Sequence, residues 1–71
     1  MPYVNIKVTD TGVTKEQKAA LIAGVSKLLK DVLDKDPAVT FVVIDEVNLD
    51  NWGVGGESVR ERDRRKALEN H

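Results

Sequence analysis

The sequence predicts an α+β fold: a β-α-β subunit with a short C-terminal hairpin. Three observations lead to this prediction. Residues 3–9 alternate between apolar and polar side chains, residues 14–33 repeat apolar side chains at helical spacing, and residues 39–44 form a nearly unbroken apolar run. A strand, a helix and a second strand in this order make a parallel β-α-β unit with a right-handed crossover.

The first strand is predicted over residues 3–9. Val4, Ile6 and Val8 share one face, and their β-branched side chains suit a half-buried strand. Lys7 points by the same alternation to the opposite face.

The helix is predicted to begin at Thr14, because residues 14–17 have the capping-box pattern of a Thr followed three residues later by a Gln. Its lysines are expected on the polar side, away from the sheet. The helix should end near Leu33, because the residues before Pro37 favour a turn. Apolar residues follow the cap at a period of 3.6 residues: Leu21, Ile22, Val25, Leu28, Leu29 and Val32.

The second strand, over residues 39–44, is apolar on both faces, as strands of covered parallel sheets are. The Gly-rich residues 53–56 then predict a hairpin turn. The domain is expected to cover residues 1–59 and a charged tail residues 60–71. Residues 57–71 carry five basic and four acidic side chains, which predicts a solvated tail that can become helical on docking.

Composition excludes several classes of protein. The 71 residues include no cysteine, and His71 is the sole histidine, so neither a metal site nor another cofactor is expected. A net charge of −1 argues against nucleic acid as a partner, and no apolar run is long enough to span a membrane. No signal-peptide pattern is present, and the cytoplasm is the expected location.

The two strands predict a homo-oligomer, because a two-stranded sheet is not stable alone and one helix covers only one of its faces. Two subunits joined edge to edge would form a dimer with a four-stranded sheet and two helices on one face. The other face would then pack against further subunits.

Pro2 is the first candidate for chemistry. Met1 before a small residue is usually removed, which would leave Pro2 with a free secondary amine. Such an amine titrates at about pH 8, and burial or a nearby cation lowers that value. A base tuned near neutrality can abstract a proton next to a carbonyl group.

Several motifs, in this order and spacing, resemble the 4-oxalocrotonate tautomerase family over residues 2–59. The resemblance implies β-α-β subunits whose dimers assemble into a hexamer. It also implies an isomerase that uses Pro2 as base and then acid on a small, anionic enol or unsaturated keto acid. The motifs are Pro2 before a short strand, the helix start with Glu16, Gln17 and Lys18, the apolar strand 41–44, Glu46, and residues 51–56.

The sequence matches only some of the family's site residues. Trp52 matches the aromatic residue, usually Phe, that walls the family's pocket. Two arginines that bind substrate carboxylates are missing, one from the loop after the first strand and one at the start of the second, where Phe41 stands. Their absence argues against the diacid substrate of the name-giving enzyme. Val54 occupies the position of the water-activating Glu of related dehalogenases, which argues against dehalogenation.

Arg60 and Arg62 are the predicted replacements for the missing arginines, because they are the cations nearest to the Gly-rich turn. In an extended segment they would share one face and could bind a carboxylate together. The competing interpretation is a non-catalytic, oligomeric module that binds a small ligand on the same fold. The missing arginines favour that module, whereas Pro2 and Trp52 favour the enzyme.

Overall fold

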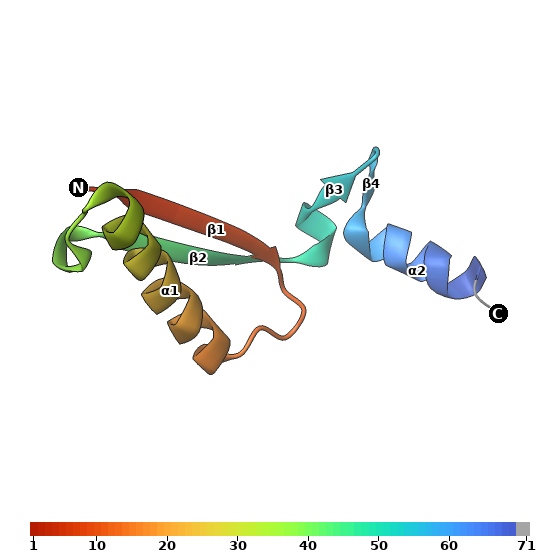
Figure 1. Cartoon of the computed structure of the whole chain (residues 1–71). Coiled ribbons are helices and arrows are strands. Elements are labelled where there is room, and N and C mark those ends of the chain that lie inside the picture. Colours follow the sequence, from red (N-terminus) through yellow and green to blue (C-terminus); the bar gives the residue numbers. More distant parts are fainter. Residues whose placement is uncertain (70–71) are drawn as a thin grey trace.

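The computed structural model describes residues 1–69 and confirms the predicted β-α-β subunit (Figure 1). Strand β1 (Tyr3–Thr9) leads through helix α1 (Lys15–Leu33) to strand β2 (Phe41–Val47), and the two strands pair in parallel. Tyr3 is opposite Phe41 at one end of the ladder, and Thr9 is opposite Val47 at the other. Asn70 and His71, which end the predicted tail, lie outside the described residues.

The predicted limits of α1 are confirmed. The backbone N–H of Gln17 donates to Thr14 Oγ1 at 3.1 Å, and the backbone N–H of Thr14 donates to Gln17 Oε1 at 2.9 Å. This reciprocal pair is the capping box that the sequence predicts. The helix ends at Leu33, and Asp34 follows in a left-handed conformation with φ of 56°.

The second strand begins later and ends later than the predicted range 39–44. A 3₁₀ turn, η1 (Pro37–Val39), takes up the first of those residues, because Asp36 Oδ1 accepts from the backbone N–H of Ala38 at 3.0 Å. β2 then continues through Asp45 and Glu46 to Val47. Asp45 and Glu46 belong to the strand because they pair with Lys7 and Val8 of β1 in the parallel ladder, and lysines form ion pairs with both carboxylates.

The predicted hairpin is confirmed beyond a second 3₁₀ turn, η2 (Leu49–Asn51). Strands β3 (Gly53–Val54) and β4 (Glu57–Ser58) are antiparallel, and Gly55 and Gly56 join them with φ of 64° and 89°. Positive φ at both central residues is typical of a two-residue hairpin turn and favours glycine. Helix α2 (Val59–Glu69) follows β4 directly.

The two faces of the β1–β2 sheet differ. An ion pair between Lys18 of α1 and Glu46 of β2 shows that α1 lies over the face that carries Val42 and Ile44. On the other face, Tyr3, Phe41 and Val43 are 65%, 51% and 42% exposed. One face of β2 is therefore open within the subunit, although the sequence predicts burial of both.

The subunit has almost no core of its own. Among residues 1–69, Val59 alone is buried, with 6% exposure. The radius of gyration is 16.4 Å, whereas a compact chain of this length would have about 11 Å. The hairpin and α2 extend beyond the end of the sheet (Figure 1). A small domain with so little buried surface is marginal on its own.

None of the helices within residues 1–69 is long and apolar enough to cross a membrane.

Candidate functional site

The predicted site residues form two groups at opposite ends of the sheet. Pro2 and Phe41 lie at the amino ends of the parallel strands, whereas Trp52, Arg60 and Arg62 follow the carboxyl end of β2. A seven-residue strand spans about 20 Å, and Figure 1 shows the N-terminus and the hairpin at opposite ends of the sheet. A single subunit therefore does not bring Pro2 and Trp52 into one pocket.

Pro2 is half-buried and is held beside β2. Its carbonyl oxygen accepts from the backbone N–H of Phe41 at 2.9 Å. Met1 before it is 84% exposed. Because the hydrogen bond uses the carbonyl group of Pro2 and not its nitrogen, loss of Met1 would free the amine without breaking the ladder.

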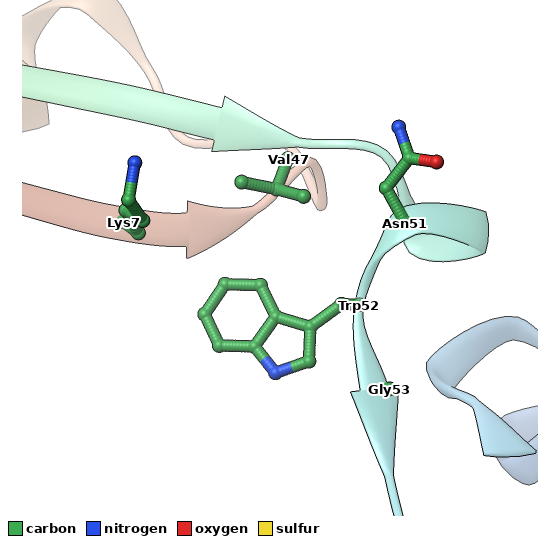
Figure 2. Close-up of a pocket in the computed structure, with 5 residues that line it drawn as sticks. All are labelled: Lys7, Val47, Asn51, Trp52 and Gly53. Atoms are coloured by element: carbon green, nitrogen blue, oxygen red, sulfur yellow. The ribbon is translucent and has the colours of Figure 1, made fainter. Parts of the chain in front are cut away.

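Trp52 lines a hollow of about 300 Å³ with Lys7, Val47, Asn51 and Gly53. Figure 2 shows the indole reaching back from the chain between η2 and β3 toward the ends of β1 and β2. The backbone holds Trp52 in place, since its carbonyl oxygen accepts from the N–H of Val59 at 2.8 Å. This hollow combines an aromatic wall with one ammonium group.

Asp45 is the centre of a polar cluster on the open face of the sheet. Its Oδ2 accepts from Asn5 Nδ2 at 2.8 Å and from Lys7 Nζ at 2.9 Å. The hydrogen bond from Asn5 lowers the pKa of Asp45 below the ordinary value of 3.8 for an aspartate. The hydrogen bond and the charge of Lys7 lower this pKa further. No local pattern in the sequence predicts this cluster, because only the parallel register places Asp45 opposite Lys7.

The two candidate arginines differ in their partners. Arg60 Nε donates to Asp50 Oδ1 at 2.5 Å, and Arg60 Nη2 donates to Asn48 Oδ1 at 3.3 Å. Arg62 Nη2 is 3.8 Å from Asp63 Oδ1, and the buried Nε of Arg62 has no hydrogen-bond partner within residues 1–69. Arg60 is thus neutralised by a carboxylate, whereas Arg62 keeps donor capacity.

The segment that holds both arginines is helical, so the shared face that an extended segment would give them is not formed. Residues two apart lie about 200° apart around a helix of 3.6 residues per turn, so Arg60 and Arg62 do not share a face. Ion pairs at helical spacing, Arg64 with Glu61 and Arg65 with Glu69, stabilise this charged helix.

A family model described as tautomerase enzyme matches residues 2–62. The chain belongs to the tautomerase family. The probable tautomerase K2 of Dickeya dadantii is 66% identical over 62 residues, which cover 87% of this chain and 92% of that protein.

Solved structures agree with this tautomerase in fold. The crystal structure of DmpI from Helicobacter pylori is 48% identical, with a TM-score of 0.81 over 89% of this chain and 97% of that one. A heterohexameric 4-oxalocrotonate tautomerase from Chloroflexus aurantiacus is 33% identical, with a TM-score of 0.78 over 86% and 97% of the two chains. The predicted fold class and isomerase activity are therefore confirmed.

The tautomerase also has an ion pair between helix and sheet. Lys18 Nζ contacts Glu46 Oε1, so the expectation that all the helix lysines point away from the sheet is wrong for Lys18. The hydrogen bond from Lys18 outweighs desolvation and lowers the pKa of Glu46 below its ordinary 4.5. This pair joins α1 to β2.

We expect the stability of the tautomerase to fall in acid partly through Glu46. A carboxylate with a lowered folded pKa stabilises the fold above its unfolded pKa, and this contribution is lost as the pH falls through the folded value. At neutral pH, Lys18→Met should therefore unfold at a lower urea concentration than the parent. As the pH falls below 4.5, the stability of Lys18→Met should decrease less than that of the parent. Lys27→Met, which removes an exposed pair with Asp31 on α1, is the control. Parallel pH curves for parent and Lys18→Met would contradict this role.

Proposed function

We propose that this tautomerase uses the N-terminal secondary amine of Pro2, after removal of Met1, as a general base and then as a general acid. The amine takes the hydroxyl proton of a small enol as the C=O bond forms, and the resulting ammonium returns a proton to carbon. The proposed substrate is an unsaturated keto acid or its dienol, and the proposed location is the cytoplasm.

The position of Pro2 carries this proposal. It stands directly before β1, its carbonyl group is fixed by Phe41, and the family match begins at residue 2. Turnover of phenylenolpyruvate by a Pro2→Ala variant tests the role. Membership in a family of isomerases favours the enzyme over the non-catalytic binding module.

The proposed assembly is a homo-oligomer of dimers, with a hexamer as the expected form. The open apolar face around Phe41 and Val43 supports it, as does the heterohexamer formed by the Chloroflexus relative. Antiparallel pairing of two β1 edges would make the predicted four-stranded sheet. It would also place Pro2 and Phe41 of one subunit next to the carboxyl end of β1 and Trp52 of its partner. Both groups of site residues could then line one pocket.

Of the two candidate arginines, Arg62 is the one proposed to bind the carboxylate of the substrate. Arg60 already binds Asp50, so Arg60→Ala should leave KM for an anionic enol within about twofold of the parent. Among the described residues, the guanidinium of Arg62 has only a long contact with a carboxylate, 3.8 Å to Asp63, so Arg62→Ala should raise KM about fivefold or more. Steady-state kinetics of both variants and the double variant measure this. Parent-like kinetics of the double variant would show that α2 only forms surface.

A further inference from the structure

The hollow beside Trp52 contains one cation in the described chain. Lys7 is the sole arginine or lysine among its lining residues, and neither Arg60 nor Arg62 lines it. The other lining residues are Val47, Asn51, Trp52 and Gly53, and the amide of Asn51 points away from the indole (Figure 2). A flat ligand that enters the hollow meets an aromatic residue and the side chain of Lys7, whose ammonium is turned away from the indole toward Asp45 (Figure 2).

The position of that ammonium is set by two neighbours on the same face of the sheet. Lys7 Nζ donates one hydrogen bond to Asp45, and Asn5 holds Asp45 from the other side. An ammonium has three N–H donors, so two remain for a ligand. The carboxylate of Asp45 also offsets the charge of Lys7 and should weaken its attraction for an anion.

We infer that Lys7 is the specificity-determining residue that binds the carboxylate of a flat, anionic ligand lying against Trp52, and that Asp45 limits this affinity. The inference deepens the proposed function and rests on it for the identity of the ligand as substrate. Lys7 thereby supplies on β1 part of the positive charge that the missing family arginines would provide. The binding itself does not depend on the chemistry of Pro2.

Trp52 gives a direct measurement, because it is the single tryptophan of the chain and lies in the hollow. Benzoate and its neutral isostere benzamide are titrated against the intrinsic tryptophan fluorescence of the oligomer. The variants are Lys7→Met, Lys7→Arg and Asp45→Asn, and Pro2→Ala separates binding from turnover. Lys27→Met is the matched control, since Lys27 also pairs with a single aspartate but lies on α1.

Lys7→Met should lower benzoate affinity by at least about tenfold and leave benzamide affinity unchanged, because only the charged contact is lost. Lys7→Arg should restore most of the benzoate affinity. Asp45→Asn keeps hydrogen-bond partners for Lys7 and Asn5 but removes the negative charge, so it should tighten benzoate binding about threefold or more. Lys27→Met should bind benzoate as the parent does.

Three results would overturn the inference. The first is equal affinity of Lys7→Met and Lys27→Met for benzoate. The second is an equal fall of the benzoate and benzamide affinities in Lys7→Met. The third is that Asp45→Asn binds benzoate no tighter than the parent. In turnover of phenylenolpyruvate, Lys7→Met should raise KM about tenfold with a smaller change in kcat. If Pro2→Ala keeps full turnover while Lys7→Met loses benzoate, the proposed role of Pro2 fails and the binding site stands.

Discussion

Pro2→Ala, with Met1 still removed, is expected to lower the turnover of phenylenolpyruvate by at least about tenfold. Loss of a positioned general base costs about 10²- to 10⁴-fold in rate. Alanine leaves a primary amine at the same place, which can still accept a proton. The expected loss in rate therefore lies at or below the lower end of that range. The hydrogen bond from the N–H of Phe41 uses the carbonyl group at position 2, which alanine keeps.

The fold provides the control for this variant. Pro2→Ala should retain the oligomeric state of the parent and its far-ultraviolet circular dichroism, because position 2 precedes β1. Unchanged turnover in a correctly processed Pro2→Ala variant would remove Pro2 from the mechanism.

Val43→Asp should dissociate the assembly and abolish turnover. Val43 lies on the face of the sheet that α1 does not cover, and it is 42% exposed in the subunit. A carboxylate there would be desolvated without a partner on association, which typically costs several kcal/mol. Each 1.4 kcal/mol is a factor of ten in affinity, so association should weaken by at least about a hundredfold.

Analytical ultracentrifugation at micromolar concentration measures this loss, and turnover of the same samples tests whether the site needs two subunits. Ala23→Asp is the control, because Ala23 is exposed on α1 one turn before Lys27. It adds the same charge and should stay assembled and active. A folded, active monomer of Val43→Asp would contradict both the interface and the shared pocket.

Local patterns in the sequence predict β1 and α1 well. The alternation of Val4, Ile6 and Val8 gives the limits of β1, and the capping box at Thr14 gives the start of α1. Both signals involve neighbouring residues and need no tertiary contact. The turn at Gly55 and Gly56 is predicted for the same reason, since it requires positive φ.

Features that depend on distant residues are not predicted. The strand β2 extends through Asp45 and Glu46 because they pair with Lys7 and Val8 of β1, which are distant in the sequence. Likewise, Pro2 and Trp52 belong to one motif in the sequence, but the length of the sheet separates them in the subunit (Figure 1). A site shared between chains leaves no local pattern.

The helical conformation of α2 cannot be predicted from apolar periodicity. Most of its side chains are charged, so no apolar pattern marks the helix. The stabilising contacts are ion pairs such as those of Arg65 with Glu57 and Glu69. Spacing of opposite charges at three and four residues was the available signal in the sequence. That spacing predicts a helix where apolar residues are few.

The state of the N-terminus tests the central claim most directly, because Pro2 is a base only if its nitrogen is a free amine. Intact-mass spectrometry and turnover are measured on the same preparation, and on a second preparation in which Met1 is retained. The account predicts that the active protein has the mass of residues 2–71 and that turnover is lost when Met1 stays attached. Undiminished turnover by a chain with the mass of residues 1–71 would contradict it.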